Sequence, residues 1–189
     1  LNSTETGKAT VEAFLKKYGS LSRLVLQWDL VSYSQIVYPN SGRSIASVAP
    51  ATRDTKKAVV CIHLTRKLPD IEHAADLTHE LTHANLLDAA TLSGKSDNVE
   101  AFIAARISGP GGEAEAFAAE CKFKRQALGD WDALCSPFKH NSVEMDLKHI
   151  SNALYDGTLS ASLTGETYPV MLAKQYRTIA MKRMLKRDR

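Results

Sequence analysis

Two histidines and a glutamate occur in the order HExxH within residues 76–88, DLTHELTHANLLD. On an α-helix, His79 and His83 would stand about 6 Å apart along the axis and on one face, so both imidazoles could reach a single metal ion. Glu80 would be displaced to the side of this pair, where a carboxylate can take a proton from water activated by the metal. The spacing therefore predicts a zinc site with His79 and His83 as ligands and Glu80 as general base.

Apolar residues flank this predicted helix on both faces. Leu77, Leu81 and Ala84 share one face, while Leu86 shares the opposite face with the histidines. We expect a helix buried between a sheet and further helices, with the histidines pointing into the interior. The alternative is a pair of ordinary core histidines, whose ring nitrogens are satisfied by hydrogen bonds without a metal.

A catalytic zinc ion normally takes three protein ligands and leaves a fourth position for water. A third histidine in the pattern HExxHxxGxxH is excluded, because Leu86 and Ala89 stand where that pattern needs Gly and His. A carboxylate from a following helix is the remaining common solution. The segment GGEAEAFAAE offers three at or near a helix start: Glu113, Glu115 and Glu120.

Helical phase ranks these three acids. Glu113 shares its face with Phe117 and Glu120, whereas Glu115 lies on a more polar stripe. Glu113 also follows Gly112 directly, in the first turn, where the helix dipole favours a carboxylate. We therefore expect Glu113 to be the third ligand, the alternative being an exposed helix-terminal acid. Glu120 could orient an imidazole or simply be solvated.

Periodicity and breakers indicate the elements that must position these residues. Turn residues at 38–44, YPNSGRS, predict a hairpin between SQIVY and SIASV, and the apolar run at 56–64 predicts a strand inside or near the edge of a sheet. The breaker SGPGG at 108–112 predicts that a second helix starts directly after it. Helical patterns occupy residues 9–18, 70–92, 113–128, 143–157 and 170–186.

Length and composition favour one mixed α+β domain. The chain has 189 residues, of which 44% are hydrophobic and 24% charged, and this is ordinary for a globular protein. We expect a single domain over residues 1–189, with the sheet and the HExxH helix in 1–92 and a helical lobe in 93–189. A net charge of +3 is too small to predict a nucleic-acid partner, and no apolar run reaches the roughly 20 residues of a membrane span.

The three cysteines form no CxxC pair. Cys121 and Cys135 could bridge in an oxidising compartment, and the alternative is that all three are buried or idle thiols. The compartment is not determined by the sequence, although we favour an exported location over a cytoplasmic one.

Residues 56–122 resemble a zincin metallopeptidase of the gluzincin type, in which HExxH on one helix and Glu on a later helix bind zinc. The resemblance implies a zincin-like α+β fold, a Zn²⁺ cofactor and hydrolysis of a peptide or protein substrate, with Glu80 as the base. It also implies that the strand at 56–64 lies along the cleft and pairs with extended substrate. The chain departs from many gluzincins four residues after the ligand, where Phe117 replaces an acid.

By the same resemblance, a Tyr or His from the carboxy-terminal lobe would stabilise the oxyanion. We prefer Tyr168, because TGETYP is a loop able to approach the cleft, although a purely structural tyrosine is the alternative. The competing function is a catalytically inactive zinc-binding module that acts in binding or regulation. The other candidates for the oxyanion role are His140, His149 and Tyr155.

Overall fold

The computed structural model describes residues 1–29, 33–37, 58–65, 68–86, 96, 98–159 and 166–187. Within these ranges the protein is an α+β structure, with a small three-stranded sheet and mainly helical content. The strands are β1 (Leu24–Asp29), β2 (Tyr33–Val37) and β3 (Val59–Thr65), and their order in the sheet is β1-β3-β2. β3 runs parallel to β1 and antiparallel to β2.

The strand predicted at 56–64 therefore lies in the middle of the sheet. Its backbone is paired on both sides, with Cys61 opposite Val25 of β1 and opposite Gln35 of β2. An extended peptide cannot add to a strand whose two edges are already bonded, so the expectation that substrate pairs with this strand is wrong for the paired residues. Both β3 and β2 contact the HExxH helix, and Ser34 of β2 hydrogen-bonds to Glu80.

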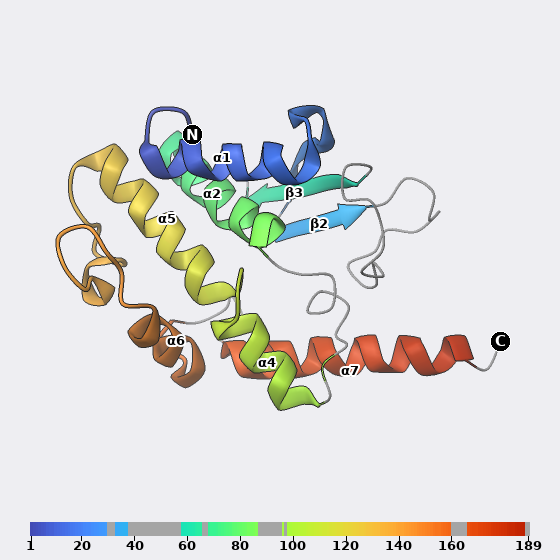
Figure 1. The fold of residues 1–189 in the computed structure, drawn as a ribbon. Coiled ribbons are helices and arrows are strands. Elements are labelled where there is room, and N and C mark those ends of the chain that lie inside the picture. Colours follow the sequence, from blue (N-terminus) through green and yellow to red (C-terminus); the bar gives the residue numbers. More distant parts are fainter. Residues whose placement is uncertain are drawn as a thin grey trace.

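One face of β3 forms a core with the first two helices. Val60, Ile62 and Leu64 alternate with half-buried residues, as expected for a strand with one face covered. They join a buried cluster with residues of α1 (Glu5–Tyr18) and α2 (Asp70–Leu86). Figure 1 shows α1 and α2 packed beside this sheet.

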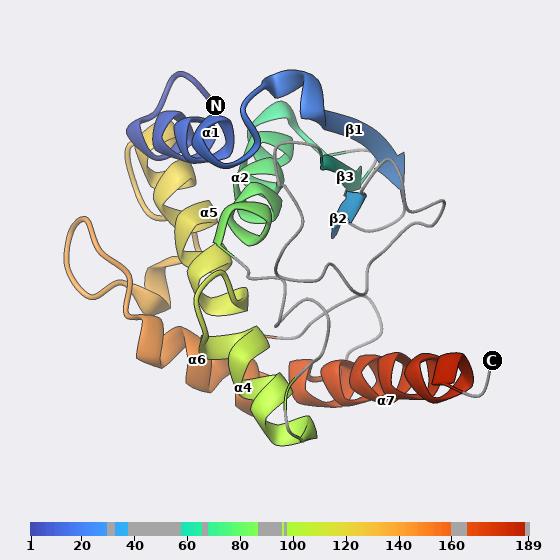
Figure 2. The same cartoon turned by 45° about the vertical axis from the view of Figure 1, so that its right-hand side comes forward.

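The remaining helices build a second core. They are α4 (Val99–Ser108), α5 (Glu113–Leu128), α6 (Leu147–Asp156) and α7 (Tyr168–Arg187), with 3₁₀ turns at Leu21–Arg23 and Ser136–Phe138 elsewhere in the chain. α5 contacts α2 along one side and α6 along another, so it links the two cores (Figure 2). The second core is formed by residues such as Phe102, Ile107, Phe117, Ile150 and Leu172.

Most predicted helices are confirmed, with shifted ends. α5 begins after Gly112 and ends at Leu128, directly before Gly129, as expected, and α2 begins at Asp70. α1 begins earlier than predicted, because Thr4 caps it by accepting a hydrogen bond from the Gly7 amide. α6 begins only at Leu147, and α7 begins two residues early, at Tyr168, with Pro169 in its first turn, where proline is tolerated.

One helix was not predicted, and two predicted features cannot be compared with the structure. α4 was not predicted, because its pattern lacks a strong apolar stripe. The turn at 38–44 and the end of the predicted 70–92 helix lie outside the described residues.

A disulfide joins Cys121 of α5 to Cys135, and Cys61 of β3 is a free thiol. The bridge closes the turn that follows α5 and holds it against the second core, to which both half-cystines belong. The expectation that these two residues could pair is confirmed. None of the helices among the residues described above is long and apolar enough to cross a membrane.

Candidate metal centre

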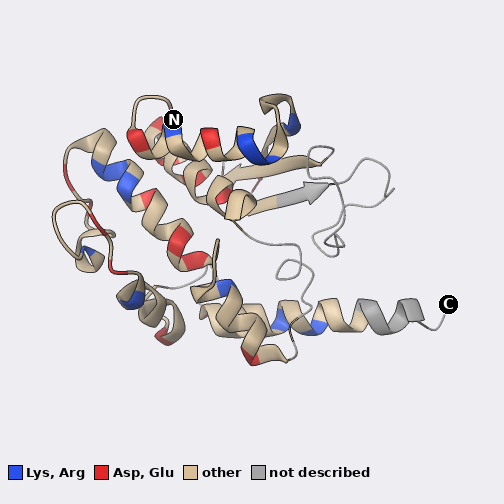
Figure 3. Ribbon diagram, in the orientation of Figure 1, with Lys and Arg blue, Asp and Glu red and all other residues tan. Residues whose placement is uncertain are grey.

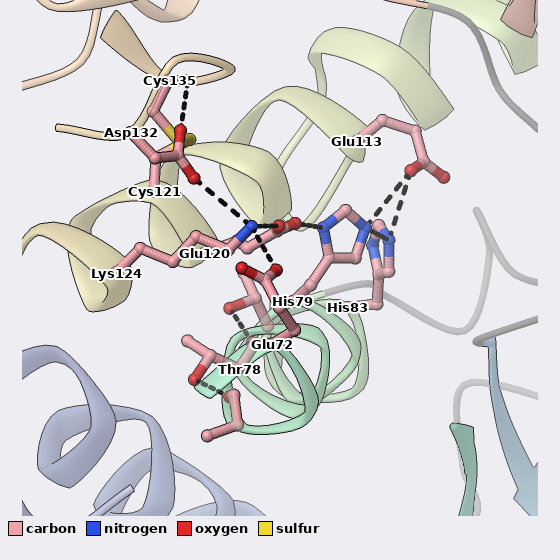
Figure 4. Close-up of polar contacts among 12 residues, drawn as sticks. Glu72, Thr78, His79, His83, Glu113, Glu120, Cys121, Lys124, Asp132 and Cys135 are labelled. Carbon is pink, nitrogen blue, oxygen red and sulfur yellow. Dashed lines mark hydrogen bonds and ion pairs between the residues drawn. A yellow bond between two sulfur atoms is a disulfide. The ribbon is translucent and has the colours of Figure 1, made fainter. Parts of the chain in front are cut away.

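His79 and His83 project from one face of α2 toward the start of α5 (Figure 4). Their Nε2 atoms lie 3.2 Å apart. Oε2 of Glu113 lies 3.6 Å from Nε2 of His79 and 3.5 Å from Nε2 of His83. These three residues form a group whose ligand atoms all lie within 4.8 Å of one another, in the part of the chain that the structure covers. The predicted ligands are thus brought together.

The glycine-rich turn before α5 places Glu113. Gly111 has φ 68°, in the left-handed region that favours glycine. A Cβ at Gly112 would stand 2.8 Å from the carbonyl oxygen of Arg106, so the backbones approach too closely for any other residue. The turn delivers Glu113 as the first residue of α5, with its side chain buried.

Glu115 has a different role. Its Oε2 accepts a hydrogen bond of 2.8 Å from the backbone amide of Gly111. The carboxylate therefore holds the turn in place and is not one of the clustered ligand atoms. Of these two acids, Glu113 is the one that lies with the two histidines, as its helical phase predicted.

Each histidine has a fixed partner for its second nitrogen. Nδ1 of His83 lies 2.7 Å from the carbonyl oxygen of Gly111, which can only accept, so this nitrogen carries the proton. Nδ1 of His79 lies 3.1 Å from Oε2 of Glu120. Burial alone would raise the pKa of Glu120, but the hydrogen bond to His79 and the charge of Lys124 lower it to about 2, so this carboxylate also accepts.

The donor set therefore suits a metal ion. With both Nδ1 atoms acting as donors, the two Nε2 atoms and Oε2 of Glu113 face a common point, and in a neutral imidazole Nε2 is then the atom with a free lone pair. Two imidazoles and a carboxylate are a typical zinc set with a fourth position left open. Partners that fix the ring orientation of metal-binding histidines are a usual part of such sites.

Charge in the cluster also favours a cation. Burial alone would lower the pKa of His79, yet hydrogen bonds to Glu113 and Glu120 raise it well above its usual value. Burial would raise the pKa of Glu113, yet His83 and His79 hold it well below its usual range. The surroundings thus stabilise positive charge between the imidazoles and Glu113, where a metal would sit.

Glu80 lies beside the ligands but outside the ligand cluster. It is 7% exposed and accepts a hydrogen bond from Ser34 of β2. Burial raises its pKa, and the two histidines oppose that rise. A raised carboxyl pKa is what a general base needs near neutral pH, so the position and electrostatics fit the predicted role.

Tyr168 is half-buried at the first residue of α7 and packs against the second core. Burial raises its pKa, and the negative charges of Glu113, Glu120 and Glu80 raise it further. The phenol therefore lies in the field of the site and keeps its proton. The other three candidates for the oxyanion role are exposed: His140, His149 and Tyr155.

Two residues were missed by sequence reasoning. A guanidinium nitrogen of Arg106, in α4, lies 3.9 Å from Oε1 of Glu113, and the buried ammonium of Lys124 contacts Glu120. The spacing Glu120-x₃-Lys124 is a helical ion-pair signal, but it does not distinguish a buried pair from a surface pair.

Comparisons with protein-family models, with curated proteins and with solved structures find no match to this chain.

Proposed function

We propose that the protein is a zinc-dependent metallopeptidase of zincin-like fold. One observation carries the proposal: His79, His83 and Glu113 converge, while Glu80 lies beside them, buried and with a raised pKa. A structural zinc site would have four protein ligands and would not need a base. Three ligands with an adjacent buried carboxylate are typical of hydrolytic zinc sites.

A zinc ion bound there would supply Lewis acidity, polarising a peptide carbonyl and acidifying water. Glu80 would take the proton from the attacking water and pass it to the leaving amine. The protonated phenol of Tyr168 would donate a hydrogen bond to the oxyanion that develops on the carbonyl. Glu120 and the Gly111 carbonyl would hold the two imidazoles in the binding tautomer.

The proposed substrate is a peptide or protein segment in extended form. β2 is the strand beside Glu80, and in the described sheet it pairs with β3 on one side. We propose that substrate lies beside β2, with its scissile carbonyl facing Glu80 and the ligand cluster. We also propose an exported location, because structural disulfides such as Cys121–Cys135 persist in oxidising compartments.

Glu80→Gln tests the proposal. The variant should bind zinc like the wild type, because Glu80 is not a ligand, but turnover of a proteome-derived peptide library should fall at least about a hundredfold, because glutamine cannot accept the proton. Glu12→Gln, on the exposed side of α1, is the matched control and should change neither property.

Two outcomes would count against the peptidase. Undiminished cleavage by Glu80→Gln would expose a contaminating protease. A wild type that binds zinc fully but cleaves no peptide at any pH tested would identify an inactive zinc-binding module.

A further inference from the structure

Lys124 is a buried cation at the centre of three carboxylates (Figure 4). Its side chain is 5% exposed. Its Nζ lies 2.8 Å from Oε2 of Glu72, 2.9 Å from Oε1 of Glu120 and 3.6 Å from Oδ2 of Asp132. The three acids come from α2, from α5 and from the turn that the disulfide closes, so one ammonium joins three parts of the chain.

This burial distinguishes the ion pairs of Lys124 from ordinary ion pairs on a protein surface. Lysine is almost never buried unless it is paired, because removal of the ammonium from water is strongly unfavourable. Burial alone would lower its pKa, but Glu120 and Glu72 raise it, so the charge is retained. An exposed pair such as Lys174 with Glu166 has no comparable cost and little effect on stability.

Glu120 connects this cation to the metal centre. Its two oxygens have different partners: Oε1 contacts Lys124 and Oε2 accepts from Nδ1 of His79. The ion pair between Lys124 and Oε1 therefore fixes the orientation of the Glu120 carboxylate and directs Oε2 toward His79. Asp132 is itself held, because its Oδ1 accepts a 2.7 Å hydrogen bond from the amide of Cys135.

We propose that Lys124 is a positioning residue for the metal centre, holding Glu120 so that His79 presents Nε2 to the metal. This inference rests on the zinc site of the proposed function, but not on peptidase activity. Without the ammonium, Glu72, Glu120 and Asp132 would face one another with no cation between them. Glu120 would turn away, and His79 would lose the partner that fixes its ring and tautomer.

Lys124→Met tests this by zinc affinity, measured on the full chain in competition with a coloured chelator. We expect the dissociation constant to rise about ten- to a hundredfold, the usual effect of losing a partner behind a ligand. Lys124→Arg keeps the charge and should restore most of the affinity. In the zinc-loaded protein, ¹⁵N shifts of the His79 ring should show a single state, with Nδ1–H and a metal-bound Nε2, in the wild type and more than one ring state in Lys124→Met.

Lys17→Met is the matched control. Lys17 also packs on α2, where its Nζ donates to the carbonyl oxygens of Ala84 and Asn85 at 2.7 and 3.0 Å. Its loss should destabilise the fold while zinc affinity and the His79 ring signals stay unchanged. A general loss of stability is thereby separated from a positioning effect.

The outcomes separate the two proposals. If the wild type binds zinc and Lys124→Met binds equally well, the role of Lys124 is overturned and the peptidase is unaffected. If zinc affinity falls as expected but the wild type cleaves no peptide, the role of Lys124 stands and the peptidase fails. A wild type without zinc affinity overturns both. Should Lys124→Met not fold, Lys124→Gln decides by the same measurement, and an affinity within about twofold of the wild type contradicts the inference.

Discussion

Every residue of the proposed ligand set has a partner behind it. His79 has Glu120, His83 has the Gly111 carbonyl at 2.7 Å, and the far oxygen of Glu113 faces Arg106. Such partners reduce the freedom of the side chains before a metal binds, so less ordering entropy is lost on binding. The ligand geometry is therefore largely preorganised by residues that would not themselves touch the metal.

Tyr168→Phe separates a catalytic tyrosine from a structural one. The phenol lies in the field of Glu80, Glu113 and Glu120, and its pKa is raised, so it is a hydrogen-bond donor. We expect kcat on a cleaved peptide to fall about a hundredfold, with zinc affinity unchanged, because the donor acts in the transition state. Tyr155→Phe, on an exposed position of α6, is the control. Unchanged kcat in Tyr168→Phe would identify a packing residue.

At the scale of elements, the register of α5 organises the site. Glu113 and Glu120 are seven residues apart, two helical turns, so both face α2, and Lys124 follows Glu120 by one turn. Acidic residues lie in the amino-terminal half of α5 and basic ones in the other half (Figure 3), which complements the helix dipole. Gly112 and Gly129 delimit the helix, and this register follows from its start.

Alanine substitutions test that register. Glu113→Ala should weaken zinc binding more than about a hundredfold, because a ligand is lost and not merely its partner. Glu115→Ala removes the hydrogen bond to the Gly111 amide, so it should cost about 1 kcal/mol of stability and leave the ligand set complete. Isothermal titration with zinc and chemical unfolding measure the two effects. Loss of zinc binding in Glu115→Ala alone would mean that the start of α5 is assigned wrongly.

At the scale of the molecule, the site lies where the two cores meet. α2 belongs to the core under the sheet and α5 to the helical core, and each contributes ligands. A metal held by both helices would tie the two cores together. Because only the folded chain brings His79, His83 and Glu113 together, binding of a metal by these residues would be coupled to folding.

Zinc should therefore stabilise the whole fold. We expect one zinc ion per chain, and at a free zinc concentration about a thousand times the dissociation constant the stabilisation is about 4 kcal/mol. Calorimetry with and without chelator measures the shift in Tm, and elemental analysis of protein purified without nickel measures the content. The double variant His79→Ala with His83→Ala should show no shift. Less than about 0.2 equivalents of zinc, with no shift in the wild type, would contradict the site.

The local part of the site was accessible from sequence. One helical period determines that His79 and His83 share a face and that Glu80 does not, and it likewise places Glu113 with Glu120. The start of α2 at Asp70, the start of α5 after Gly112 and its end before Gly129 follow from caps and breakers, which act within a few residues. These features depend on the backbone of a single element, so a single stretch of sequence determines them.

The tertiary structure decided the rest. That α5 packs against α2 with Glu120 beside Nδ1 of His79, 41 positions away, depends on which faces of two helices meet. The same packing buries Lys124 between acids of different segments, and the pairing of β3 on both sides depends on the order of three strands. These contacts arise from the burial of apolar surface across the whole chain, to which every element contributes at once, and no local period encodes them.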